Sequence, residues 1–436
     1  MKNALTLCMV FVITISMAQD TPVSVGEFLV ADQKSAATKA QKDRIDFLQK
    51  SSANMPVIDD IEFRIRNNAY EFDRQRYSLR LEPRGFGETK ASRNLYETNL
   101  ARQKQKKKVM ESKLLRKRYN LVLDYMYVQS MLGLYKQLNV LYEDKVKVMK
   151  NSTGSLKFNV VDIIDIENEY TKLKFDNIER ERTLNNKRNK INKILARNAF
   201  ENFDTSSFIS IERIRGQVDS KAFTLDPDNV YVEYGKLQLE LAKNRYKLES
   251  AEGRRYINFF QFSYDHDNMK DELEIRDANE SLSDYLKEDY NLNRAYLFDI
   301  ALRIPFFNVD RHDINRRKLS YLSEKEDFNE LKDDLQKRIE KDAEDITILI
   351  SQYTFLKARK NDVDAESSLK KYLEMDGVDP IKLLSIRESV LRNDIKIEKI
   401  KYDILRNYIR IIDATGQLCK KPLKNYLSST MEVITK

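Results

Sequence analysis

The sequence is poor in the residues that interrupt regular structure. It has 10 Gly, 7 Pro and no Trp in 436 residues, whereas 33% of its residues are charged. Because Gly and Pro mark most turns, this scarcity excludes a fold of many short elements and favours long helices with few turns. The two Cys are Cys8, within an apolar N-terminal segment, and Cys419. They provide neither a disulfide framework nor a Cys-based metal site.

Residue types that carry enzyme chemistry are also scarce. The only His residues are His266 and His312. The sequence contains no Cys pair, no Gly-rich loop that would cradle a phosphate and no nucleophile flanked by small residues. It therefore predicts a protein that is not an enzyme and that has no cofactor and no metal site.

The first 18 residues have the pattern of a secretory signal. Lys2 is the basic start, residues 4–15 form an apolar core, and Ser16 to Ala18 make a cleavage site before Gln19. We therefore expect a signal peptide at 1–18 and a mature protein outside the cytoplasm.

The net charge of +8 would suggest a nucleic-acid partner for a cytoplasmic protein. The strongest basic run is Lys104 to Arg118, but Val109, Leu114 and Leu115 interrupt it. This spacing favours the solvated face of a helix. Together with export, it predicts no nucleic-acid partner.

Four short segments alternate between apolar and other residues, as strands with two different faces do. They are Tyr296 to Ile304, Ile61 to Arg66, residues 77–82, and Tyr256 to Tyr264, whose two faces are the least distinct. Pro83 and Pro305 end two of them, since Pro cannot donate to a strand ladder. Polar loops join the segments into two hairpins, and the second of these loops, residues 266–294, is acidic.

Helical periodicity covers most of the remaining chain. It predicts long helices at about 89–150, 161–199, 230–252, 311–373 and 381–415, the fourth in an uninterrupted stretch on the order of 100 Å long. Leu121 to Tyr142 is rich in apolar residues, but Asp124 and Lys136 within it favour packing against other helices over membrane insertion. Residues 202–227 form a polar, mixed segment, and we expect a loose tail from Gly416 onward.

The order of these elements indicates an internal repeat. Leu79 to Pro83 matches Leu302 to Pro305, and the candidate tip glycines Gly154 and Gly377 follow the two prolines at nearly equal distances. The chain therefore contains two copies of a helix, a hairpin, a long helix, a tip and a return helix.

This order resembles the TolC family of outer membrane efflux and secretion channels over essentially the whole mature chain. Two local matches support the resemblance: Leu302 to Phe306 before a helix, and Val161 to Ile166, with Asp162 and Asp165 three residues apart at the start of a return helix. The resemblance implies a mainly α fold with a small β part. Its predicted parts are a first TolC-like repeat at 19–201, a linker or equatorial segment at 202–227, a second repeat at 228–415 and a C-terminal tail at 416–436.

The resemblance also implies a homotrimer, in which four transmembrane strands per protomer close a 12-stranded β-barrel in outer membrane lipid and the helices form a periplasmic tunnel. An open sheet in lipid would leave an unpaired edge, so closure by several copies is expected on physical grounds as well. The side chains expected to face lipid are Ile61, Phe63, Ile65, Tyr77, Leu79, Leu81, Tyr296, Phe298, Ile300, Leu302 and Ile304. Those expected to face the barrel lumen are Glu62, Arg64, Arg66, Arg76, Arg80, Glu82, Asp299 and Arg303.

The lumen set is net basic and would favour anionic solutes. The alternative is that its arginines and carboxylates pair across strands and only stiffen the barrel.

Carried over from the family, Asp162 and Asp165 would form a carboxylate ring at the periplasmic entrance; the alternative is a solvated helix face. The aligned positions of the second repeat are Lys382 and Ser385. The tips at Gly154 and Gly377, candidates for contact with an adaptor, lack the Val-Gly dipeptide of tips that dock into one.

The leading functional hypothesis is therefore a passive exit duct that works with a periplasmic adaptor and an inner membrane transporter, in a tripartite efflux pump or a type I secretion system. The alternative is a non-conducting envelope or coiled-coil scaffold, which would leave the four alternating strands unexplained.

Overall fold

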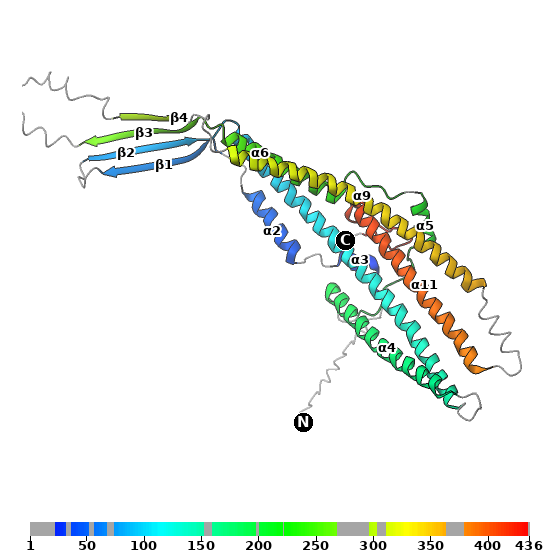
Figure 1. The fold of residues 1–436 in the computed structure, drawn as a ribbon. Helices are drawn as coiled ribbons and strands as arrows, with labels where there is room; N and C mark the ends of the chain where they lie inside the picture. Colours follow the sequence, from blue (N-terminus) through cyan, green and yellow to red (C-terminus); the bar gives the residue numbers. More distant parts are fainter. Residues whose placement is uncertain are drawn as a thin grey trace, which may run out of the picture. The chain divides into compact units, whose positions relative to one another are not determined.

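The computed structural model describes residues 22–31, 36–51, 56–67, 74–151, 159–197, 200–220, 222–267, 296–302, 311–362 and 379–434 (Figure 1). The predictions for the N-terminal signal, for Gly154 and Gly377, for Arg303 and Ile304, and for the acidic loop beyond Asp267 lie outside these residues.

Long helices dominate the fold, as predicted. They are α3 (Glu88–Asn151), α4 (Val160–Leu195), α6 (Val230–Glu252), α9 (Arg311–Asp362) and α11 (Pro380–Ala414), with shorter helices α1 (Val25–Val30), α2 (Ala36–Lys50) and α5 (Ile211–Asp219). Helix α9 has 52 residues, about 78 Å at the usual rise, and the predicted continuation to residue 373 lies beyond the described part. No helix of the described residues is long and apolar enough to cross a membrane.

Helices α4 and α11 each follow a polar residue whose side chain caps the first turn. The Asn159 side chain accepts a hydrogen bond from the Val161 amide at the start of α4. Asp379 does the same for the Ile381 amide of α11, whose first residue is Pro380. Such caps satisfy amide groups that the first helical turn leaves without partners.

Apart from shifts of one residue, the described helices differ from the sequence prediction at two places. Helix α4 ends at Leu195 rather than 199, because Ala196 adopts a left-handed conformation with φ of 53° and the Arg197 amide turns back onto the Asn192 carbonyl. Helix α5 lies within the segment that was predicted to be a polar linker. Its signals were the Ser210 cap, which accepts from the Arg213 amide, and the buried residues Ile211 and Ile214.

The four strands form one antiparallel sheet in the order β1 (Ile58–Asn67), β2 (Arg74–Pro83), β3 (Ile257–Asp267) and β4 (Tyr296–Leu302). The two hairpins are thus joined through the β2–β3 pair, which connects the two halves of the chain (Figure 1). The predicted mainly α fold with a small four-stranded part is confirmed.

The chain divides into two compact units. Unit 1 contains residues 1–35, 112–226 and 337–436, and unit 2 contains residues 36–111 and 227–336 with the whole sheet. Helices α3 and α9 contribute to both units.

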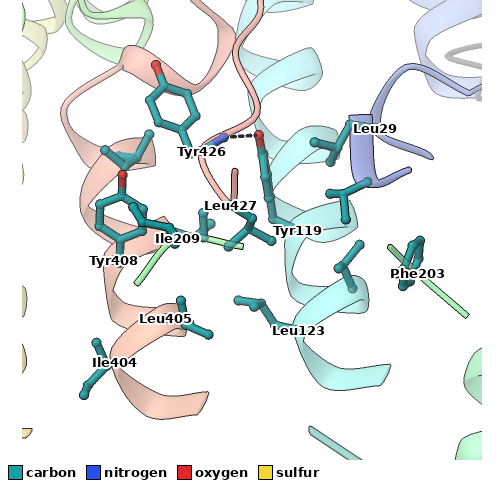
Figure 2. Packing of buried hydrophobic residues seen from close by; sticks show 14 of the residues in the cluster. Leu29, Tyr119, Leu123, Phe203, Ile209, Ile404, Leu405, Tyr408, Tyr426 and Leu427 are labelled. Atoms are coloured by element: carbon teal, nitrogen blue, oxygen red, sulfur yellow. Dashed lines mark hydrogen bonds between the residues drawn. The ribbon is translucent and has the colours of Figure 1, made fainter. Parts of the chain in front are cut away.

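The hydrophobic core of unit 1 draws on segments that are far apart in the sequence. Leu29, Tyr119, Leu123, Phe203 and Tyr408 belong to one buried cluster (Figure 2). The Tyr426 amide donates to the Tyr119 hydroxyl at 3.2 Å, and that hydroxyl in turn donates to the Lys424 carbonyl at 3.0 Å. Burial raises the pKa of Tyr119 above its ordinary range.

The expectation of a loose tail from Gly416 is wrong. Leu427 is fully buried in the core of unit 1, and Leu418 and Tyr426 belong to the same cluster. The Ile209 amide donates to the Leu427 carbonyl at 2.8 Å. The tail therefore packs as part of the core.

The basic run also needs one correction. Lys104 and Lys108 are exposed, as expected, but Arg118 is buried and donates to the Phe28 and Leu29 carbonyls at 3.4 and 2.7 Å. A buried guanidinium can exchange its hydrogen bonds to water for hydrogen bonds to backbone carbonyls in this way. Arg118 therefore holds the end of α1 against α3 and is not part of a solvated face.

Candidate channel wall and entrance

The sheet has one continuous apolar face. The strand register places apolar residues directly opposite one another across all four strands in three rows: Ile61, Leu81, Phe260 and Ile300; Phe63, Leu79, Phe262 and Phe298; and Ile65, Tyr77, Tyr264 and Tyr296. Phe63 is 63% exposed and Phe298 is 56% exposed. Aromatic rings also meet across strands, with the centroids of Phe262 and Phe298 5.9 Å apart.

This register also assigns the two faces of β3, which were the least distinct in the sequence. Phe260, Phe262 and Tyr264 join the apolar rows, although none was among the residues predicted to face lipid. An irregularity in the β3–β4 pairing between Ile257 and Phe259 changes the alternation near the start of the strand. Phe259 alternates with Phe260 and therefore lies on the other face, with the Arg80 guanidinium 3.9 Å from its ring centroid.

The opposite face of the sheet is polar at its centre. Ser78 and Ser263 are partners in the register, 4% and 2% exposed, and their hydroxyl oxygens are 3.1 Å apart. Leu297 is the next partner in the same row, so this face is not uniformly polar.

The charged residues predicted for the lumen that the structure describes, which exclude Arg303, lie on this second face. Glu62, Arg80 and Asp299 share one row, which Gln261 completes, while Arg66 lies opposite Arg76 in another. Two ion pairs on this face run along single strands. Arg64 bonds Glu62 at 2.5 Å, and Arg80 bonds Glu82 at 2.9 Å. Each pair joins residues two apart on one strand, not residues on neighbouring strands.

A charged cluster joins the sheet to the helices of unit 2. Asp59 of β1 accepts from Arg84, just after β2, at 3.1 Å and from Arg255, just before β3, at 2.7 Å. The Gly85 amide donates to Glu88 at 2.7 Å. A Cβ at Gly85 would lie 2.7 Å from the Ala251 carbonyl oxygen, so this approach requires glycine. Alternation patterns gave no signal for this cluster.

A second polar cluster connects α3 and α11 in unit 1. Glu388 accepts from Lys145 at 2.5 Å, from the Tyr142 hydroxyl at 2.7 Å and from Arg392 at 2.6 Å. Further along the same helix pair, the Tyr402 hydroxyl donates to Asp124 at 2.7 Å. The contacts between the two helices were not predicted, because their partners lie more than 240 positions apart in the chain.

The carboxylate of Glu388 is strongly stabilised in its charged form. Burial by itself raises the pKa of such a group, but the hydrogen bonds from Lys145, Tyr142 and Arg392 outweigh that effect and lower the pKa of Glu388 to about 2. The same cluster raises the pKa of Tyr142, chiefly through burial and the hydrogen bond to Glu388.

The four residues predicted for the periplasmic entrance are all exposed and lie in the first turns of α4 and α11. The Asn159 side-chain amide donates to the Asp162 carboxylate at 3.2 Å, so Asp162 also takes part in the helix cap. The Ser385 hydroxyl donates to the Ile381 carbonyl of its own helix at 2.9 Å. Asp165 and Lys382 are exposed on the surfaces of α4 and α11. An entrance ring and a solvated helix face both require this exposure.

No protein-family model and no curated protein matches the chain, but solved structures do. The outer membrane protein VceC from Vibrio cholerae aligns with a TM-score of 0.63 and 10% identity, over 90% of this chain and 95% of that one. CusC, whose structures describe transmembrane channel formation, gives 0.61 and 12% over 90% and 91%. The Campylobacter jejuni outer membrane channel CmeC gives 0.61 and 10% over 94% and 86%.

Each of these alignments covers nearly all of both chains, so the likeness extends to the complete arrangement of elements and not only to a helical hairpin. At such low identities the likeness concerns the fold alone. The chain has the fold of the TolC-family outer membrane channels that its sequence resembles.

Proposed function

We propose that this chain is the protomer of a passive outer membrane exit duct. Three copies would close a 12-stranded β-barrel in the outer membrane, and their helices would continue it as a tunnel into the periplasm. A periplasmic adaptor and an inner membrane transporter would supply the substrate and the energy, in a tripartite efflux pump or a type I secretion system.

The observation that carries this proposal is the apolar face of the sheet. Its three rows cross all four strands without a charged residue, yet most of the side chains are exposed in the single chain. Exposed apolar surface of this extent marks a membrane or protein contact. In the part of the chain that the structure describes, the sheet ends at β1 and β4. In lipid those edges require partners, and further copies of the same sheet provide them.

The opposite face suits an aqueous lumen. It carries Glu62, Arg64, Arg80 and Asp299, together with the bonded hydroxyl groups of Ser78 and Ser263. The ion pairs along β1 and β2 partly neutralise the arginines. Any anion preference of the wall is therefore weaker than a count of charges suggests.

Conductance of the purified protein in a planar bilayer tests the proposal. Phe298→Arg and Leu297→Arg are a matched pair, because the two residues are neighbours on β4 and lie on opposite faces of the sheet. A cation at the centre of the lipid face costs about 2–4 kcal/mol per copy. We expect discrete channels for the wild type and for Leu297→Arg, and none for Phe298→Arg. A wild-type protein that assembles in detergent but never conducts would favour the envelope scaffold.

The entrance role is tested by Asp162→Ala/Asp165→Ala, with Glu179→Ala, an exposed change on the same helix, as control. A carboxylate ring at a narrow entrance attracts cations. We therefore expect lower cation selectivity for the double variant and no change for the control. Equal effects of the two variants would assign both aspartates to a solvated helix face.

A further inference from the structure

Two aspartates lie buried where α3, α9 and α11 meet within unit 1, and they belong neither to the channel wall nor to the entrance. Asp413 of α11 is held on both carboxylate oxygens. The Ser112 hydroxyl donates to one oxygen at 2.9 Å, and Arg116 donates to the other at 3.0 Å. These bonds from α3 replace the water that the charge gives up on burial. Asp342 of α9, which is only 1% exposed, is held differently.

The Asp342 carboxyl group has a partner on one side only. Arg410 of α11 binds its Oδ1 at 3.0 Å, whereas Oδ2 is buried and has no hydrogen-bond partner among the residues that the structure describes. The Arg410 side chain is 41% exposed and also donates to Asn407 at 3.2 Å, so water and a second acceptor compete for it. A buried carboxylate with an unbonded oxygen is costly, and a proton on that oxygen removes its charge.

The charges around this carboxyl group do not offset its burial. Burial raises the pKa of Asp342 above its ordinary range, and the negative charge of Asp345, three residues further along α9, adds to the rise. The Arg410 guanidinium opposes the rise, as do Arg338 of α9 and Arg116 of α3, but burial prevails. Asp342 therefore binds a proton at a pH at which an exposed aspartate is ionised.

We propose that Asp342 is a proton-binding group that controls how closely α9 packs against α11. With the proton bound, the carboxyl group is neutral and the two helices pack closely at this level. When the proton leaves, the buried charge draws in water, and the contact between residues 338–346 of α9 and 406–413 of α11 opens locally. The contact is therefore tight in acid and looser toward neutral pH. The inference concerns packing inside unit 1 and does not depend on the proposed function.

The pH dependence has a definite direction. Because the pKa of Asp342 is higher in the folded chain than the ordinary value of 3.8, its proton stabilises the fold fully below pH 3.8. This contribution is lost as the pH rises through the raised pKa. The Glu388 carboxylate responds in the opposite direction, because its pKa is lowered in the folded chain. The two groups can therefore be distinguished by the sign of their effect and by their position on α11.

Hydrogen exchange of the full chain in detergent, followed by mass spectrometry, tests the proposal. Each exchange rate is divided by the intrinsic rate at the same pH, because intrinsic exchange itself depends on pH. In the wild type, peptides that cover 338–346 and 406–413 should lose protection as the pH rises from about 4 to about 8. Asp342→Asn, which stays neutral, should keep its protection. Glu344→Gln, an exposed change on the same helix, should respond as the wild type does.

A further variant keeps the test decisive if Asp342→Asn does not fold. Arg410→Gln removes a cation that favours the ionised carboxylate, so the loss of protection should move to higher pH. A loss of protection in Asp342→Asn equal to that of the wild type would overturn the proposal. So would weaker protection of Asp342→Asn than of the wild type at neutral pH, a response in Arg410→Gln that does not move to higher pH, or the absence of a response in Glu344→Gln.

Discussion

The core of unit 1 and the apolar face of the sheet use similar side chains in opposite environments. In the core, Leu427 and Ile409 are fully buried by other parts of the same chain. On the sheet, Phe63 and Phe298 remain mostly exposed. One chain therefore buries the core by itself. The apolar face of the sheet is stabilised only when something outside the chain covers it. Four substitutions or conditions test this contrast.

The largest effect is expected in the core. Leu427→Ala removes a fully buried side chain from the packed tail, and such changes typically cost about 2–5 kcal/mol of unfolding free energy. Urea unfolding, followed by circular dichroism of the protein in detergent, measures the loss. Val433→Ala is the control, because Val433 is half exposed. If the two variants lose the same amount, the tail is not part of the core.

The next effect is a loss of folding free energy in lipid when the Phe262 side chain is removed. Its side chain is largely exposed in the single chain and lies in the central apolar row. Burial of such a side chain in lipid contributes about 1.5–3 kcal/mol. Phe262→Ala should therefore lower the free energy of folding into vesicles, measured by urea titration of the vesicle-bound protein. An unchanged free energy of folding into vesicles would contradict burial of this face in lipid.

The α3–α11 cluster is expected to contribute less than the core, because it is only partly buried. Glu388→Ala leaves the buried Lys145 ammonium without its carboxylate. Loss of a charged hydrogen-bonding partner costs roughly 2 kcal/mol. The same urea experiment measures it. The control is Lys147→Ala, which removes the exposed Lys147–Glu143 pair on the surface of α3 and should leave the midpoint unchanged.

The smallest effect is a pH dependence of stability. The pKa of Glu388 is lowered from 4.5 to about 2 in the folded chain, so the ionised carboxylate stabilises the fold above pH 4.5. This contribution is lost as the pH falls from 4.5 toward 2.

The difference in unfolding free energy between the wild type and Glu388→Gln should therefore shrink over that range. Asp342 and Asp403, whose pKa values are raised by burial, occur in both proteins and cancel in the difference. A difference that is independent of pH would contradict the role given to the Glu388 carboxylate.

Local patterns were sufficient to predict most of the elements. Helix α6 has the predicted bounds, and α3 differs from its prediction by one residue at each end. The alternation in β1, β2 and β4 separated the two faces correctly, because side chains on a strand alternate with a period of two. In β3 the alternation was less distinct, because the apolar Phe259 shares a face with Gln261 and Ser263, and only its pairing with β2 and β4 determined its faces.

The parts that were missed depend on contacts between distant segments. The tail from Gly416 carries Lys420, Lys421 and Lys424, which indicate solvent, yet Leu418 and Leu427 find buried sites in the core. Arg118 belongs to a basic run, but its guanidinium binds two carbonyls of α1. The Glu388 cluster needs α3 and α11 side by side. No local sequence pattern indicates that such distant segments are in contact.

The position of the core in the chain also affects when the protein can fold. The Tyr119–Tyr426 hydrogen bond joins residues 307 positions apart, and Phe28 and Leu427 share one core. Synthesis must therefore deliver nearly the whole chain before the core of unit 1 can close, and contacts over such separations form slowly. Until then the apolar strands and the long helices are exposed to proteases and to one another. The nascent chain therefore stays open to proteolysis and aggregation until its last core residues arrive.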